Sequence, residues 1–218
     1  MNAPLRIVAL DPDQPDDFLA VAGDYLRGWV YSRPPDRPLL NHWKSLAGFQ
    51  PDQIRIAYRG DTPRAVLHGE LHDQGGTVHL LASRPDAGED AFALLNQFDR
   101  LIQSRAGRQW RGPFWGSAVF YGGYVLGNEP YIPSWDTPGT CAFVRAGCRM
   151  EIRGVLLVRP LQDEIPQEPV PAGYEIVPAA RGPEYDAQPF GYHALFQGQK
   201  AAHCYARFYP HLTAPGGG

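Results

Sequence analysis

The alternation of apolar and polar positions predicts strands and helices in turn over the first half of the chain. The apolar run LRIVAL at residues 5–10 indicates a strand. Apolar side chains then recur at helical spacing between Asp16 and Leu26, and a second, shorter helix is expected over residues 40–46. Three strand-like runs follow, over residues 54–58, 64–72 and 77–82. The sequence DQGG joins the last two runs and predicts a hairpin, because glycine tolerates the positive φ angles of tight turns.

The clearest helical pattern in the chain lies after that hairpin. Apolar residues recur every three or four positions from Ala91 to Ile102, and Asp86 with Glu89 resembles an N-terminal cap for this helix. Three shorter elements are expected beyond it: a strand over residues 110–114, a helix over residues 140–145 and a strand over residues 149–159. Residues 115–135 are rich in glycine and aromatic residues and show no period.

A polar, proline-rich stretch divides the chain. Residues 160–172 have the composition of a semi-rigid linker, so we predict one domain over residues 1–159 and a second unit over residues 173–218. In this second unit a strand is expected at residues 174–178 and a mostly helical stretch over residues 184–209. So short a unit cannot bury a core of its own. We therefore expect it to be incomplete, and to pack on the first domain, on a second copy in a homodimer, or on a further C-terminal module.

Composition and charge narrow the class of protein. A hydrophobic fraction of 44% and an aromatic fraction of 12% are typical of a globular chain. The net charge of −3, without a basic patch, argues against a nucleic-acid partner. No apolar run approaches the roughly 20 residues of a membrane span, and no signal peptide is evident. Three cysteines without a CxxC motif suit a reducing compartment, so we expect a cytoplasmic protein. Lys44 and Lys200 are its only lysines beside many arginines, as in a GC-rich bacterial genome.

The residues most suggestive of chemistry lie on the predicted hairpin. Side chains alternate along a strand, so His68, Glu70 and His72 share one face, and the turn brings His79 onto it opposite Glu70 or His72. Three imidazoles and a carboxylate could hold a transition metal. Glu70 and a histidine could instead act as a general base pair. The third interpretation is a half-exposed sheet face without chemistry, and the sequence leaves all three open.

The order of the predicted elements resembles that of the GNAT acetyltransferase superfamily over roughly residues 4–159. The sequence VHLLASRPDAGEDAFALL at residues 78–95 is similar to the strand, pyrophosphate loop and helix of that family. CAFVRAGCRMEIRGVLLV at residues 141–158 is similar to its closing helix, glycine turn and final strand. GYEIVPAA, from Gly173, resembles the first strand of a second such unit, as in tandem members. The resemblance implies an α+β fold, with a mixed, mostly antiparallel central sheet flanked by helices, plus a partial second unit.

The resemblance also implies a reaction. GNAT enzymes transfer an acyl group directly from acyl-CoA to an amine, so acetyl-CoA is the expected cofactor and a small-molecule or peptide amine the expected substrate. The cofactor-binding residues would be Leu81, Ala82, Arg84, Ala87 and Gly88. The acid–base candidates are Glu70, His72 and His79 from the hairpin, with Tyr124 chosen among Tyr121, Tyr124 and Tyr131 to protonate the leaving thiolate.

The cofactor loop departs from the family pattern. The family has Gln or Arg, two residues, Gly, one residue, and Gly or Ala. With its first glycine aligned on Gly88, Pro85 and Asp90 occupy the other two positions. Asp86, Glu89 and Asp90 also place carboxylates at the start of the helix, where they would satisfy its dipole and repel a pyrophosphate.

A second departure concerns the closing helix. The family has a tyrosine four residues before the glycine, whereas Phe143 stands four residues before Gly147. The sequence therefore predicts an N-acyltransferase relative with degenerate catalytic machinery. The alternatives are a non-catalytic GNAT-like module that binds a ligand or partner through residues 115–135, and a metal-binding protein that uses the histidine face of the hairpin.

Overall fold

The computed structural model describes residues 3–28, 33–46, 49–73, 75–105, 109–112, 120–121, 132, 136–149, 169–178 and 190–206. The chain separates into two compact units near residue 150. The predicted linker, residues 160–172, lies mostly outside the described residues, as does the strand expected over residues 149–159. None of the helices in the described part of the chain combines the length and apolarity that a bilayer crossing requires.

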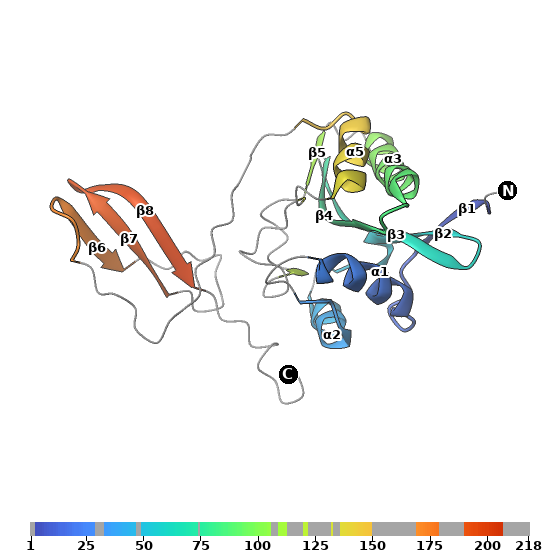
Figure 1. Ribbon diagram of the computed structural model, residues 1–218, viewed down its shortest axis with the longest axis horizontal. Coiled ribbons are helices and arrows are strands. Elements are labelled where there is room, and N and C mark those ends of the chain that lie inside the picture. Colours follow the sequence, from blue (N-terminus) through green and yellow to red (C-terminus); the bar gives the residue numbers. More distant parts are fainter. Residues whose placement is uncertain are drawn as a thin grey trace. The chain divides into compact units, whose positions relative to one another are not determined.

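The first unit is built on a five-stranded sheet (Figure 1). Its strands, in spatial order, are β1 (Leu5–Ala9), β2 (Ile54–Arg59), β3 (Thr62–His72), β4 (Gly75–Ser83) and β5 (Gln109–Arg111). Neighbours from β1 to β4 are antiparallel, and β5 is parallel to β4. The predicted α+β class, with a mixed and mostly antiparallel sheet, is therefore confirmed.

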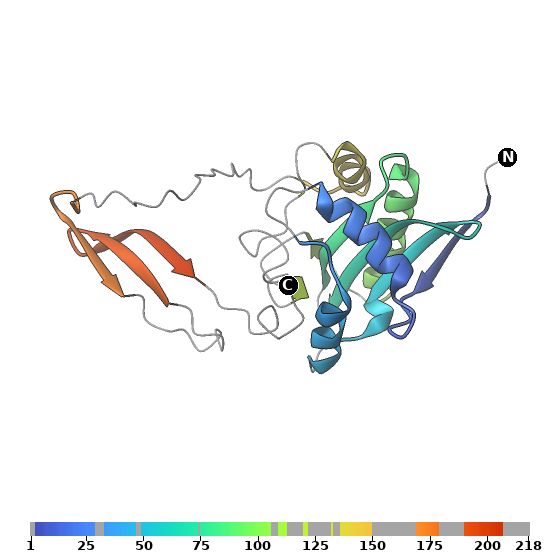
Figure 2. The same ribbon diagram turned by 60° about the horizontal axis from the view of Figure 1, so that its bottom comes forward.

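Helices cover both faces of this sheet. They are α1 (Asp16–Arg27), α2 (Arg37–Ser45), α3 (Gly88–Ser104) and α5 (Thr137–Arg145), and a short 3₁₀ helix, η1 (Pro51–Gln53), precedes β2. α3 and α5 pack together on one face, and α1 crosses the opposite face with α2 beside it (Figure 2). Asp36 and Asp136 cap α2 and α5 by accepting the backbone N–H of Leu39 and Gly139. Gly147, at φ +84°, follows the end of α5 as expected.

Each face of the sheet has its own set of buried side chains. Leu67 and Val78 pack against Leu94 and Phe98 of α3 on one face. On the other face the core includes Phe18 of α1 and Trp43 of α2, both fully buried and in edge contact with each other. Burial of each such side chain contributes about 1.5–3 kcal/mol to folding, so both helix layers hold the sheet firmly.

One irregularity interrupts the β3–β4 hairpin. His68 pairs with Leu80 and Gly69 pairs with Val78, so the register passes over His79. An extra residue of this kind forms a β-bulge, which changes the direction of its side chain. The imidazole of His79 accordingly lies 5.0 Å from that of His68, centroid to centroid. The bulge thus places the ring of His79 beside that of His68, on the face that α1 and α2 cover.

The start of α3 differs from the prediction. Ala87 is the N-cap residue, and no side chain caps the helix there. Asp86 instead forms an ion pair with Arg64 of β3 at 2.7 Å. The expected cap was wrong because arginines from neighbouring elements bind the carboxylates that the helix start would otherwise use.

The second unit contains a three-stranded antiparallel sheet, formed by β6 (Tyr174–Pro178), β7 (Phe190–Phe196) and β8 (Gln199–Ala206). The strand at residues 174–178 was predicted, but the helix expected over residues 184–209 is wrong for residues 190–206. Tyr192 and Phe196 fit a helical period and a strand period equally well. Gln197 and Gly198, both with positive φ, form the tight turn that joins β7 to β8.

Candidate functional site

β3 and β4 bring together a buried polar cluster on the α1–α2 face of the sheet. Nε2 of His79 lies 3.1 Å from Oε2 of Glu70, and Nδ1 of His68 lies 3.0 Å from the hydroxyl of Tyr121. Both imidazoles are fully buried, whereas the side chain of Glu70 is 32% exposed. The sequence left open whether His79 would lie opposite Glu70 or His72, and the bulge brings it to Glu70.

Aromatic side chains enclose this cluster. The ring of Trp43 lies 5.1 Å from that of His68, and Phe120 lies 4.6 Å from His68 and 4.7 Å from His79. The indole Nε1 of Trp43 donates a hydrogen bond to the carbonyl of Phe120. The interpretation as a half-exposed polar face is therefore wrong for both histidines. Sequence reasoning missed Trp43 and Phe120, although the apolar face of α2 signalled that Trp43 would be buried.

Burial and neighbouring charges set the protonation of these groups. Burial, with a smaller contribution from His79, lowers the pKa of His68 well below its usual value, so His68 is neutral at pH 7. The hydrogen bond from His79 lowers the pKa of Glu70, which keeps this carboxylate ionised. Burial raises the pKa of Tyr121 well above its usual value, so its hydroxyl stays protonated. The cluster therefore has one ionised carboxylate beside a proton donor.

The three hairpin histidines do not converge on a common point. His79 contacts Glu70, His68 contacts Tyr121, and the exposed His72 lies 3.0 Å from the hydroxyl of Thr77 through its Nε2. Within the described ranges no three His, Cys, Asp or Glu side chains are arranged to hold a metal ion. The described structure therefore gives the metal-binding interpretation no support.

The bulge lies close to the described pairing of β4 with β5. Among the described residues this parallel pairing runs from Gly75 to Thr77 of β4 and from Gln109 to Arg111 of β5, so its last pair lies two residues before His79. The two strands approach closely: a Cβ on Gly75 would clash with the backbone of Gln109, and one on Gly112 would lie 2.6 Å from Cβ of Val78. Glycine is needed at both positions for this close approach of the two strands.

The residues expected to bind the cofactor lie at the end of β4 and the start of α3. Leu81, Ala82 and Ala87 are buried. Arg84 forms an ion pair with Asp24 at 3.4 Å, and its Nε donates a hydrogen bond to the carbonyl of Pro63. Gly88 lies close to the first turn of α5, since a Cβ added to it would be 3.6 Å from Cβ of Pro138.

Each carboxylate at the start of α3 has an arginine partner. Asp86 pairs with Arg64, as described above. Asp90, which is buried, lies 2.8 Å from Nε of Arg59 and 3.7 Å from that of Arg64. Glu89 accepts two hydrogen bonds from Arg145 of α5, at 2.6 and 3.2 Å. The guanidinium groups hold the pKa of Asp86 and of Glu89 below their usual values. The negative charges of the three carboxylates are thus neutralised by arginines from other elements, and the sequence alone did not indicate these ion pairs.

The tyrosine candidates for protonating a thiolate have different positions. Tyr124 and Tyr131 lie outside the described residues, and Tyr121 is buried against His68. Phe143, at the family's tyrosine position, is buried in the core on α5, with its ring 6.0 Å from that of Trp110. Its side chain has no proton to donate, so Phe143 cannot take the role of the family's tyrosine.

No protein-family model matches the sequence, and no curated protein matches it either. Solved structures do. An aminoglycoside acetyltransferase from an uncultured soil metagenomic sample is 11% identical, and the match covers 72% of this chain and 97% of that one with a TM-score of 0.47. A protein from Thermus thermophilus is 15% identical over 73% of this chain and 99% of its own, with a TM-score of 0.45.

A third similar structure is a tandem GNAT protein from the clavulanic acid biosynthesis pathway. It is 16% identical, and the match covers 93% of this chain and 74% of that one with a TM-score of 0.47. The order of elements expected from the sequence, from the first strand to the helix over residues 140–145, is reproduced from β1 to α5.

Proposed function

We propose that this chain is a GNAT-type N-acyltransferase, which moves an acyl group from acetyl-CoA to an amine of a small molecule or peptide in the bacterial cytoplasm. The position of the β4 bulge carries this proposal. His79 lies in the bulge, two residues beyond the last described residue pair of β4 and β5, and its imidazole lies 3.1 Å from Glu70. A carboxylate and an imidazole therefore lie within hydrogen-bond distance of each other, close to the pairing of β4 with β5.

Glu70 is the member of the pair that a substrate can reach, because His79 is fully buried. An amine that attacks an acyl carbon must lose a proton, and Glu70 accepts it. His79 positions the carboxylate through the hydrogen bond between its Nε2 and Oε2 of Glu70. Acetyl-CoA would supply the acyl group as a thioester, whose carbon–sulfur bond breaks as the carbon–nitrogen bond forms.

The start of α3 limits how tightly acetyl-CoA can bind. Backbone N–H groups at a helix start favour a pyrophosphate, and Arg84, Ala87 and Gly88 would contact it, with Leu81 and Ala82 beside it in β4. The arginines that surround this helix start are already paired with carboxylates. The segment therefore has no surplus positive charge, and we expect a dissociation constant of about 0.1–1 mM.

Acetyl transfer to a panel of amines tests the proposal. We expect slow release of free CoA thiol with the wild-type chain, and at least a hundredfold lower rate for Glu70→Gln, because general-base catalysis typically contributes about 10²–10⁴. Glu175→Gln is the matched control, since Glu175 is an exposed strand residue of the second unit. Equal rates for Glu70→Gln and wild type would contradict the assigned base.

A non-catalytic binding module is the second candidate function. Phe143 in place of a proton donor and the paired carboxylates at α3 favour it. The two candidates differ in one measurement. If about 5 mM acetyl-CoA raises the melting temperature of the chain but no acetyl group is transferred to an amine, the binding module is supported. Absence of any stabilisation contradicts the catalytic proposal for this chain.

A further inference from the structure

The residue pairing that contains Glu70 continues across three strands. Glu70 of β3 pairs with Thr77 of β4, and Thr77 pairs with Arg111 of β5. Residues that pair in register project their side chains to the same face of a sheet. Neighbouring strands lie about 4.8 Å apart, so the Cα atoms of Glu70 and Arg111 are about 10 Å from each other. A carboxylate and a guanidinium therefore share one face of the sheet, two strands apart.

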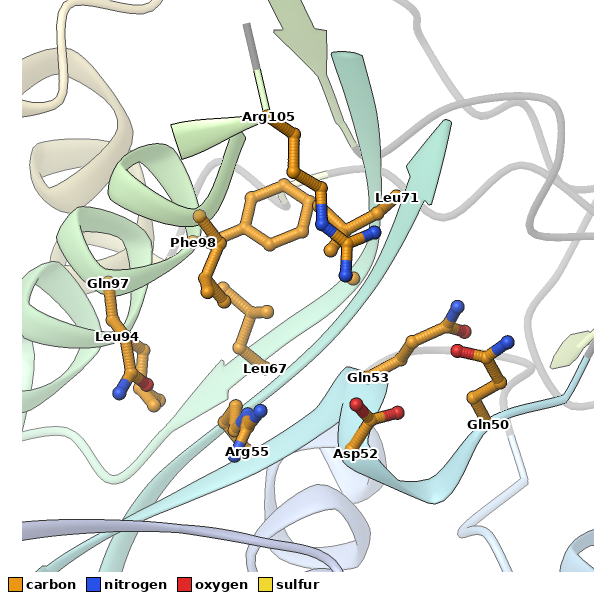
Figure 3. A pocket seen from close by; sticks show the side chains of 12 residues that line it. Gln50, Asp52, Gln53, Arg55, Leu67, Leu71, Leu94, Gln97, Phe98 and Arg105 are labelled. Carbon is orange, nitrogen blue, oxygen red and sulfur yellow. The ribbon is translucent and has the colours of Figure 1, made fainter. Parts of the chain in front are cut away.

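Leu71 shows which face this is for β3. It lies on the α3 face, where it lines a cavity of about 140 Å³ together with Phe98, Arg55 and Gln97 (Figure 3). Side chains alternate along a strand. Glu70, the neighbour of Leu71, therefore projects to the α1–α2 face.

Trp110 shows the same for β5. Its ring lies 6.0 Å from the ring of Phe98 of α3 and 6.0 Å from that of Phe143 of α5, both of which belong to the α3 face. Arg111, the next residue, therefore projects to the α1–α2 face, as Glu70 does.

Solvent reaches this end of the α1–α2 face. The side chain of Glu70 is 32% exposed, and Arg111 is exposed. The next row across the strands consists of His72, Gly75 and Gln109, of which His72 and Gln109 are exposed. Glycine at position 75 leaves no side chain between these two. We call the four polar residues the hairpin-end surface: Glu70, His72, Gln109 and Arg111.

The hairpin-end surface presents one carboxylate and one guanidinium. The carboxylate of Glu70 attracts an ammonium group. The guanidinium of Arg111 has five N–H donors, so an interaction within the chain leaves others for a carboxylate or a phosphate. The same guanidinium repels a second positive charge on a substrate.

We infer that the amine acceptor is a zwitterion, which has a carboxylate or phosphate group close to its amine. Glu70 binds the amine, and Arg111 binds the anionic group. The inference rests on the proposed function, because Glu70 is the base of that reaction. It adds a class of substrate, and it makes Arg111 a residue that determines specificity.

Matched pairs of amines test the inference with the full chain and acetyl-CoA. β-Alanine is compared with β-alaninamide, and O-phosphoethanolamine with ethanolamine, so the two pairs distinguish a carboxylate from a phosphate. Spermidine represents amines with further positive charges. We expect kcat/KM to be roughly tenfold or more higher for one zwitterion than for its neutral counterpart, because the anionic group adds a charge-assisted contact. Spermidine should give the lowest value.

Variants at Arg111 separate the effect of charge from that of packing. Arg111→Gln should abolish the preference for the zwitterion, and Arg111→Lys should retain part of it, because lysine keeps the charge without the bidentate geometry. Arg111→Glu should shift the preference toward spermidine. Arg100→Gln is the control, because Arg100 is an exposed residue of α3 and should leave the preference unchanged.

Calorimetry without acetyl-CoA keeps this inference distinguishable from the proposed reaction. A zwitterion that binds below about 10 mM and binds more weakly to Arg111→Gln, without any acetyl transfer, supports the hairpin-end surface and contradicts the reaction. Transfer that does not favour a zwitterion, or a preference that persists in Arg111→Gln, overturns the inference and leaves the reaction intact. Absence of both binding and transfer overturns both.

Discussion

The two faces of the central sheet differ in how many of their buried polar groups have a hydrogen-bond partner. On the α1–α2 face, His79 is hydrogen-bonded to Glu70 and His68 to Tyr121, and only Nε2 of His68 lacks a described partner. On the α3 face, Gln53, Arg55 and Gln97 each have a buried atom that no described residue satisfies. The first face is therefore a network whose members depend on one another. On the second face, three buried polar atoms have no described partner that a substitution could remove.

This difference predicts opposite responses to substitution. Removal of one member of a satisfied network leaves its partner buried and unpaired, which costs free energy, whereas removal of an atom that already lacks a partner costs little.

The largest effect is expected at Trp43, which covers the network. Trp43→Ala should lower the free energy of unfolding by about 3–5 kcal/mol, because it opens a cavity beside His68 and deletes the hydrogen bond to Phe120. Urea unfolding followed by circular dichroism measures this. Trp43→Phe keeps a ring and should lose clearly less, and an equally large loss would assign the effect to the hydrogen bond alone.

A smaller loss is expected at Tyr121. Tyr121→Phe removes the hydroxyl that lies 3.0 Å from Nδ1 of His68, and should cost about 1–3 kcal/mol because that nitrogen remains buried. A double-mutant cycle with His68→Leu isolates the interaction, since the two losses should then not add. Strict additivity in that cycle would mean that the two side chains do not depend on each other.

The stability of the folded chain should also depend on pH through His68. Its pKa is lowered on folding, so below its ordinary value of 6.5 the unfolded chain binds a proton that the folded chain does not. Above pH 6.5 the neutral His68 costs the folded chain no stability. Below pH 6.5 the free energy of unfolding should fall as the pH drops, by up to about 1.4 kcal/mol per pH unit. Urea midpoints between pH 7 and pH 5.5 measure the slope. His68→Leu should flatten it, and the exposed His72→Gln should leave it nearly unchanged.

The smallest effect is expected on the other face of the sheet. Gln97→Met should change the free energy of unfolding by less than about 0.5 kcal/mol, because Oε1 of Gln97 has no described partner to lose. The same urea titration, run beside Tyr121→Phe, measures it. A loss as large as that of Tyr121→Phe would remove the contrast between the two faces.

Local patterns in the sequence predict much of the first unit but not its site. Strand alternation places Glu70 with His68 correctly, since it depends only on neighbouring residues. The bulge at His79 has no comparable local signal, and it decides which partner His79 finds. The cover by Trp43 and the cavity between Arg55 and Gln97 join residues far apart in the chain, and only the folded packing brings them together.

The second unit shows a different limit. The aromatic and aliphatic residues around Tyr192 satisfy helical and strand periods alike, so the pattern does not distinguish the two structures. The turn at Gln197 and Gly198 decides for strands, because both residues adopt positive φ and reverse the chain within two positions. Glycine after a polar residue was the available sign of a hairpin there.

The bulge in β4 has one further consequence. Val78 before it and Leu81 after it both face the α3 core, and they keep the spacing of an uninterrupted strand once His79 is left out of the count. Deletion of His79 would therefore restore a regular hairpin, and all the remaining side chains of β4 would stay on the faces that they now occupy. His79, the partner of the proposed base Glu70, is thus the one residue of β4 that the pairing with β3 does not need. A variant that lacks only His79 should keep the fold and lose the proposed site.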